Sequence, residues 1–223
     1  MATKTITPGL YLLTAACGII DATTFLALGM VFAEIMTGNL MFLAFGIGQG
    51  QAVESIWNYV VPLVTFSLGA IGGGAVLRGR WAHGRVRLGY LLVAALVFIA
   101  FVLAFLWRPT AETTQAMVVV GILAFAMGLQ NALVLFHAVP DVATNVMTLT
   151  LVRLLSSWSV IGGTNERWRY RVASLLVFFL AAMLGAYLVR FGPHVGLGVA
   201  VLVYVIAMPW LLRGRSPVEA APA

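Results

Sequence analysis

The stretch Gly18-Ile19-Ile20-Asp21-Ala22, followed by Met36-Thr37-Gly38-Asn39-Leu40, puts polar residues inside an otherwise apolar part of the chain. A second stretch, Gly128-Leu129-Gln130-Asn131-Ala132, followed by Met147-Thr148-Leu149-Thr150-Leu151, resembles it. The offset is 110 residues for the first element (18 to 128) and 111 for the second (36 to 147). A hydrophobic unit that repeats with matched polar positions is typical of membrane transporters built from two halves around a shared site.

The composition places the chain in a membrane. Hydrophobic residues make up 62% of its 223 residues and charged residues 9%, and the mean hydropathy is +1.03. Soluble domains carry about 25% charged residues, so a water-facing surface of the usual polarity is excluded. We expect a single membrane domain over 1–223, with a first repeat at about 9–107 and a second at about 115–213. Cys17 is the only cysteine, so no disulfide can form within the chain.

Apolar runs set the expected number of membrane spans. A helix needs about 20 apolar residues to cross the hydrocarbon core. Two shorter segments, 32–50 and 140–160, are interrupted by polar residues and glycine, and they are either full crossings or re-entrant elements. We expect the first long run to remain as an uncleaved helix. The long runs lie at about 9–30, 56–78, 88–107, 115–137, 171–190 and 194–213.

The arginines favour the re-entrant alternative. With six spans and the N-terminus inside, the basic clusters at 78–87 and 167–171 both lie on the cytoplasmic side, and only Arg108 and Arg190 lie outside. Eight crossings would separate the two clusters. The sequence therefore predicts an all-α integral membrane protein with six transmembrane helices, two re-entrant or broken helical segments and cytoplasmic N- and C-termini. Three crossings per half make this a 3+3 inverted repeat.

Small residues in the third element of each half predict close helix packing. Ala70-Ile71-Gly72-Gly73-Gly74 is matched by Ala181-Ala182-Met183-Leu184-Gly185. Both have the small-xxx-small spacing that lets helix backbones approach each other in lipid. The glycine-rich faces also allow a homodimer.

The repeated stretches at 18–22, 36–40 and 128–132, with Val139-Pro140-Asp141 and Met147-Thr148, resemble the YoaK family of bacterial membrane proteins. The resemblance covers nearly the whole chain. It implies a small multi-pass protein of the bacterial inner membrane, in a family classed as a domain of unknown function. One difference is Leu149, which stands where the family usually has a glycine, so the second short segment is not expected to turn as tightly as the first.

Asp21 is the sharpest candidate for a functional residue. It lies near the middle of the first span, where an ionised carboxylate is costly unless it is paired, hydrated or protonated. We expect it either to couple transport to a proton or cation, or to hold helices together through hydrogen bonds. Its counterpart in the second repeat is the uncharged Asn131, next to Gln130, so coupling through this pair would be asymmetric.

The short segments supply further polar candidates. Thr37, Asn39, Thr148 and Thr150 carry groups that can donate and accept hydrogen bonds. They are expected to contact a polar substrate near a half-helix terminus, or to cap the broken helices and satisfy free backbone groups.

Glu34 and Asp141 are candidates for the edges of the site. Glu34 is expected either to bind a cation at the outer mouth or to be a solvated interfacial charge. Asp141 follows Pro140 and is expected to cap the second short helix. His137 precedes Asp141 by four residues, but Pro140 argues against a continuous helix between them. No catalytic residue, metal site or enzymatic activity is therefore expected.

The sequence favours the transport of a small solute, coupled through Asp21 and a midplane site. The alternatives are a narrow channel of the same architecture and a non-transporting assembly or partner protein. The expected partners are the lipid bilayer, an unidentified small solute and a second copy of the chain. No nucleic acid and no cofactor are expected.

Overall fold

The structure is a computed structural model in which residues 2–77, 82–111, 113–137, 147–159, 162–164 and 167–213 are described. Helices account for most of these residues, and no strand occurs among them. The helices are α1 (Ala2–Ala27), α2 (Met36–Gly48), α3 (Val53–Val76), α4 (Ala82–Trp107), α5 (Thr114–His137), α6 (Met147–Ser156), α7 (Trp168–Leu188), the 3-10 helix η2 (Val189–Phe191) and α8 (Pro193–Arg213).

Six of the described helices are long and apolar enough to cross a membrane, and two are not. With 13 and 10 residues, α2 and α6 are about 20 and 15 Å long, which is well short of the hydrocarbon core of about 30 Å. The predicted division into six spans and two short segments is confirmed. The six spans are Ile6–Ala27, Ile56–Val76, Gly84–Trp107, Thr114–Leu135, Trp168–Phe191 and Pro193–Arg213.

The two halves of the chain pack in corresponding ways. Helix α1 of the first half packs on α7 and α8 of the second, and helix α5 of the second half packs on α3 and α4 of the first. The short helices α2 and α6 pack on α3 and α7, respectively. Corresponding helices of the two halves are also buried to the same extent. The buried share of the span is 61% in α1 and in α5, 33% in α4 and in α8, and 17% in α3 and in α7. The first and fifth helices therefore form the centre of the bundle.

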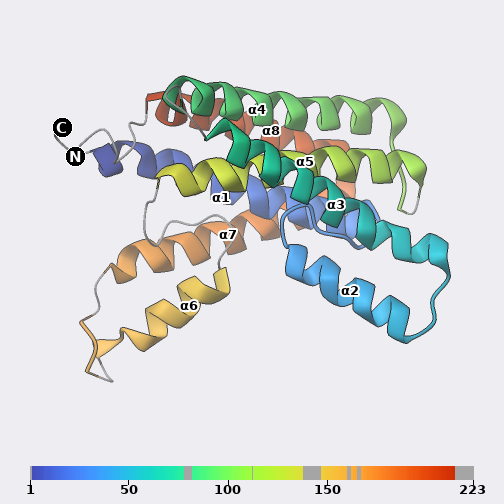
Figure 1. Cartoon of the computed structure of the whole chain (residues 1–223), viewed down its shortest axis with the longest axis horizontal. Coiled ribbons are helices and arrows are strands. Elements are labelled where there is room, and N and C mark those ends of the chain that lie inside the picture. The colour runs from blue at the N-terminus through green and yellow to red at the C-terminus, as the bar shows by residue number, and fades with distance from the viewer. Residues whose placement is uncertain are drawn as a thin grey trace.

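The short helices lie at opposite ends of the bundle. Figure 1 shows α2 beside one end of the long axis and α6 beside the other, near the N-terminus. An inverted repeat requires this arrangement. The opposite orientation of the two halves across a membrane remains a prediction.

The chain reverses direction after α1. Gly29 has φ 120° and Met30 has φ 57°, both in the left-handed region that ends a helix. The predicted first span reached residue 30, whereas α1 ends at Ala27. The reversal carries Val31 and Glu34 into the interior, where both are buried.

Close helix contacts at glycine occur at equivalent places in the two halves. A Cβ added at Gly18 of α1 would lie 2.8 Å from the carbonyl oxygen of Phe178 in α7. A Cβ added at Gly128 of α5 would collide with the carbonyl oxygen of Phe66 in α3. These two glycines match in the sequence repeat, and their partners occupy matching helices.

The third helices match in a register that differs by one residue from the predicted one. A Cβ added at Gly185 would lie 2.9 Å from the carbonyl oxygen of Ile19, and one added at Gly73 would lie 3.0 Å from that of Leu129. The sequence alignment paired Gly185 with Gly74, which has nothing within 4 Å of an added Cβ. The rotation of α3 about its axis turns Gly73, and not Gly74, toward α5. The spacing of the glycines in the sequence does not determine this rotation.

Candidate functional site

A buried set of polar side chains lies where the two halves meet. It involves two residues of α1, one residue of the segment before α2, two residues of α5 and one residue of α8. None of these side chains is more than 9% exposed. We call the set the central polar cluster, and its members are Cys17, Asp21, Glu34, Gln130, Asn131 and Tyr204.

Hydrogen bonds from Glu34 connect the two halves. The side-chain amide of Asn131 donates to Glu34 Oε1 at 3.0 Å. The backbone N–H of Glu34 donates to Asp21 Oδ1 at 2.9 Å, and the backbone amide of Ala33 also faces the Asp21 carboxyl group. Glu34 is therefore the residue through which α1 and α5 share one hydrogen-bonded network.

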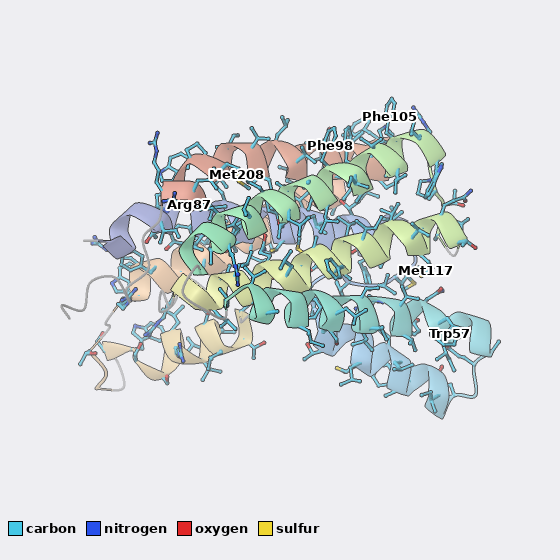
Figure 2. The ribbon with its side chains drawn as sticks, turned by 45° about the horizontal axis from the view of Figure 1, so that its top comes forward. Trp57, Arg87, Phe98, Phe105, Met117 and Met208 are labelled. Carbon is cyan, nitrogen blue, oxygen red and sulfur yellow. The ribbon has the colours of Figure 1, made fainter. Side chains whose placement is uncertain are left out.

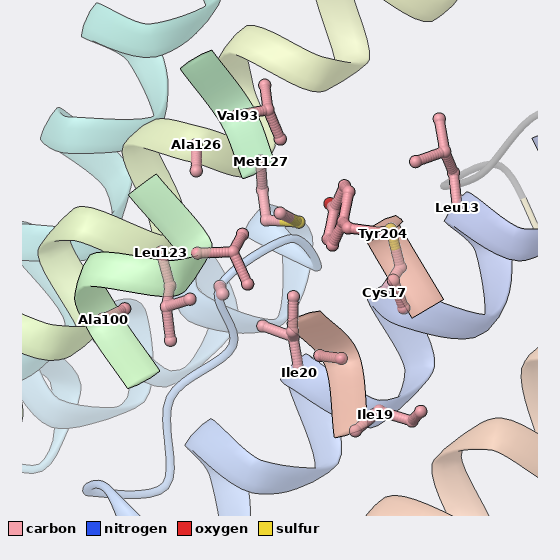
Figure 3. Close-up of a cluster of buried hydrophobic side chains, with 14 of the residues drawn as sticks. Leu13, Cys17, Ile19, Ile20, Val93, Ala100, Leu123, Ala126, Met127 and Tyr204 are labelled. Carbon is pink, nitrogen blue, oxygen red and sulfur yellow. The ribbon is translucent and has the colours of Figure 1, made fainter. Parts of the chain in front are cut away.

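A second branch of the cluster reaches α8. Gln130 Nε2 donates to the sulfur of Cys17 at 3.2 Å, and the Tyr204 hydroxyl donates to Gln130 Oε1. The Cys17 thiol also lies beside the Glu34 carboxyl group. Figure 3 shows Tyr204 reaching from α8 to a position between Cys17 and Met127.

Apolar side chains surround this branch. Figure 3 shows Leu13, Ile20 and Val93 around Tyr204, and all three are fully buried. The apolar surroundings exclude water. They therefore strengthen the hydrogen bonds of the cluster and raise the free-energy cost of a polar group without a partner.

Two acidic side chains, Asp21 and Glu34, belong to the cluster. Among the described residues, Asp21 and Glu34 are the only buried side chains that can carry a charge near neutral pH. Asp21 Oδ2 is buried and has no hydrogen-bond partner in the described part of the chain. An uncompensated buried charge is strongly unfavourable, so Asp21 would have to be protonated or to face a cation at this oxygen. No group of three or more metal-binding side chains occurs within the described ranges.

Three of the predicted site residues lie together, and a fourth lies elsewhere than predicted. Asp21, Gln130 and Asn131 all belong to the central polar cluster. Glu34 was expected at the outer mouth or in the solvated interface, but it is 4% exposed and lies in the interior. The reason is the chain reversal at Gly29, which a linear assignment of spans does not include.

Asn39 has the structural role that was one of its two expected roles. Its side chain accepts from the N–H of Phe32 at 2.9 Å and donates to the carbonyl oxygen of Phe32 at 2.7 Å. The amide thereby holds the returning segment against α2. Thr37, two residues earlier, is exposed. Gly38 lies in the first turn of α2, where its missing side chain makes room for the Phe32 ring.

The second short helix repeats the pattern of burial but lies away from the cluster. Thr150 is buried and Thr148 is exposed, as Asn39 and Thr37 are in α2, and α6 lies at the other end of the bundle in Figure 1. Leu149 continues the α-helix that begins at Met147, as Gly38 does after Met36, so neither residue forms a turn. Asp141 and the His137 side chain lie outside the described residues.

Sequence reasoning missed the role of Cys17 and Tyr204. Cys17 precedes Asp21 by four residues, which places both on one face of α1. The repeat offset also gave a signal for Glu34, because the offset of 111 matches it with Asn145, another polar residue. Tyr204 is a tyrosine in an apolar span, and only the packing of α8 shows that its hydroxyl meets Gln130.

Comparison with known proteins identifies the family. The family described as "Protein of unknown function (DUF1275)" matches residues 9–209. The "UPF0700 transmembrane protein YoaK" of Bacillus subtilis (strain 168) is 29% identical over 154 residues, which cover 67% of this chain and 66% of that relative. The match thus spans just under two thirds of the relative's length. No solved structure matches the chain. The matched region includes the central polar cluster and nearly all six spans, and the chain belongs to the DUF1275 family of membrane proteins of unknown function.

Proposed function

We propose that the protein transports a small solute across the bacterial inner membrane and that Asp21 and Glu34 couple this transport to a proton or another cation. The observation that carries the proposal is the pair of buried carboxyl groups at the junction of the two halves, together with Asp21 Oδ2, which has no hydrogen-bond partner in the described part of the chain. Intramembrane acidic groups of this kind commonly mark proton or ion pathways.

The position of the pair supports a transporter over a purely structural role. Asp21 and Glu34 come from the first half, and Asn131, which holds Glu34, comes from the second. Relative movement of α1, α7 and α8 against α3, α4 and α5 would break or remake this contact, and alternating access works by such movement around a fixed site. Neutralising the acidic pair in one state and releasing the proton or cation in the other would link movement to ion flow.

A ligand-binding experiment tests the coupling role. The purified protein is unfolded by heat in the presence of sodium, potassium, tetramethylammonium or small neutral metabolites, at acidic, neutral and alkaline pH. A ligand that binds the native state raises its apparent stability by mass action. A cation that competes with protons for the carboxyl pair should give its largest shift in unfolding temperature at alkaline pH.

Variants assign such a shift to the cluster. Asp21→Asn and Glu34→Gln keep the shapes of the side chains and remove one charge each, so both should abolish the pH-dependent part of the shift. Ser67→Ala changes an exposed residue of α3 that belongs to no candidate site, and it is the control. If both charge variants fold and keep the pH-dependent shift of the wild type, the carboxyl pair does not couple transport. Asp21→Glu, which restores a carboxyl group, distinguishes loss of charge from loss of fold.

Flux measurements in vesicles separate the alternatives. A transporter should give saturable flux that depends on pH and stops in Asp21→Asn. A narrow channel should conduct far faster than a conformational cycle allows. The absence of any flux with any compound, together with a change in the abundance of Asp21→Asn, would favour the partner-protein alternative.

A further inference from the structure

A groove between α6 and α7 lies apart from the central polar cluster. It has a volume of about 390 Å³ and almost entirely apolar walls. Two tryptophans contribute to the walls, and tryptophan is enriched where a membrane meets water. The lining residues are Leu154, Leu155, Trp158, Trp168 and Val172.

The helix that forms one wall is suited to the membrane interface. At 10 residues, α6 cannot span a bilayer. It buries Thr150, whereas its apolar side chains Leu151, Val152 and Leu155 are 45–54% exposed. A short helix that turns leucine and valine outward and carries Arg153 in its last turn has the composition of an interfacial amphipathic helix.

Arginines surround the groove. Arg171 donates from Nη1 to the carbonyl oxygen of Arg153 and to the hydroxyl of Ser157, both at 2.7 Å, and it thereby joins α6 to α7. The guanidinium carbon of Arg169 lies 5.7 Å from the ring centre of Trp168, which is itself a wall of the groove. The positive charges are therefore at the edge of the apolar surface.

The local charge is strongly positive. Residues 153–171 contain four arginines and one acidic residue, Glu166, so the segment carries a net charge of +3. Figure 2 shows Arg87 toward the same end of the bundle as α6, whereas Trp57, Phe105 and Met117 lie toward the other end. Of the described arginines, Arg108, beside the ring of Phe105, and Arg190, in η2, lie at that other end.

We propose that this groove binds an anionic phospholipid, with an acyl chain against the leucines and tryptophans and the phosphate group near Arg153, Arg167 and Arg169. The ligand that fits an apolar groove with a cationic edge is an amphiphile with a negative headgroup. Arginine suits a phosphate because its guanidinium can form two parallel hydrogen bonds with it. A second copy of the chain fits less well, because a two-fold interface at this face would bring two +3 segments together.

Quenching of tryptophan fluorescence by brominated lipids tests the proposal. The full chain, with the four tryptophans outside the groove (Trp57, Trp81, Trp107 and Trp210) replaced by phenylalanine, is placed in vesicles of phosphatidylcholine and phosphatidylglycerol. The bromine is carried by the acyl chains of one lipid or of the other. At equal mole fractions, brominated phosphatidylglycerol should quench Trp158 and Trp168 more strongly than brominated phosphatidylcholine.

Charge variants test the headgroup contact. The triple variant R153Q/R167Q/R169Q should lose the preference for phosphatidylglycerol, by about fivefold in relative affinity for each arginine removed. Arg171 is left unchanged because it joins α6 to α7. The control is R108Q/R190Q, in which two arginines beside the rings of Phe105 and Tyr187 at the other end are replaced, and it should keep the preference.

Several outcomes would overturn the inference. Equal quenching by the two lipids in the unmodified arginine background would show no anionic site, and an unchanged preference in the triple variant would place the site elsewhere. Quenching that falls as the ratio of protein to lipid rises would indicate that a second copy covers the groove. If the triple variant does not fold, the test is repeated with added salt on the protein that keeps its arginines. Screening should weaken its preference for phosphatidylglycerol, and a preference that salt does not change would overturn the inference.

Discussion

Asn39 shows how one side chain positions the acidic pair. Its amide makes two hydrogen bonds with the backbone of Phe32, and Glu34 follows two residues later with its N–H on Asp21. The Phe32 ring stacks on Phe25 at a centroid distance of 4.7 Å, which holds the same segment from the α1 side. The amide therefore acts on the cluster through the conformation of the returning segment.

We expect Asn39→Ala to lower the free energy of unfolding by about 1–3 kcal/mol, because it leaves the partly buried N–H and carbonyl groups of Phe32 without these partners. Thermal unfolding in detergent measures the change. Thr37→Ala is the control, because an exposed side chain in the same helical turn should matter by no more than about 0.5 kcal/mol. Equal effects of the two substitutions would show that the Asn39 contacts do not stabilise the fold.

At the scale of helices, two of the most extensive contacts are duplicated. α1 packs on α7 and α5 packs on α3, with Gly18 and Gly128 at matching points. Attraction between helices in lipid depends on van der Waals packing and small residues rather than on the hydrophobic effect. The positions of these glycines therefore decide how closely each pair approaches.

Adjacent glycines of α3 allow a matched test of this packing. Gly73→Ala should destabilise the protein by about 1–3 kcal/mol, the usual cost of overpacking, because the new methyl group would lie 2.5 Å from Cβ of Ala132. Gly74→Ala should be neutral or stabilising, by up to about 1 kcal/mol, because an added Cβ has nothing within 4 Å and alanine favours a helix. The unfolding temperatures of the two variants show which glycine faces α5. The reverse order of stability would support the register expected from the sequence alignment.

For the whole molecule, the remaining question about the fold is the orientation of the two halves. The short helices lie at opposite ends of the bundle in Figure 1. Arg108 and Arg190 lie at the end opposite the arginine-rich segments of α6 and α7. The positive-inside rule then predicts that α6 lies toward the cytoplasm and α2 toward the outside.

Cysteine labelling of intact cells tests this topology. In a Cys17→Ser background, single cysteines at the exposed positions Met30 and Ala52 should react with an impermeant maleimide from outside. A cysteine at the exposed Ser159 should react only after the cells are opened. Labelling of positions 30 and 52 from opposite sides would show that α2 crosses the membrane, which excludes the six-span topology.

The amino-acid sequence was enough to predict the membrane class, the division into six long and two short helices, the family and three members of the cluster. The length of an apolar run sets whether a helix can cross the bilayer. A polar residue in such a run is costly unless it faces the protein interior, which is why Asp21, Gln130 and Asn131 stood out.

Three features depend on how the helices pack and could not be predicted: the burial of Glu34, the contacts of Cys17 and Tyr204 with Gln130, and the close contact at Gly73 and not at Gly74. In a soluble helix the apolar stripe shows which side faces the core. In these spans the side facing lipid and the side facing protein are both apolar, so the sequence does not fix the rotation of a helix about its axis. Chain reversal at Gly29 and close packing at glycine fix that rotation, and they bring the acidic pair to the amides of the other half.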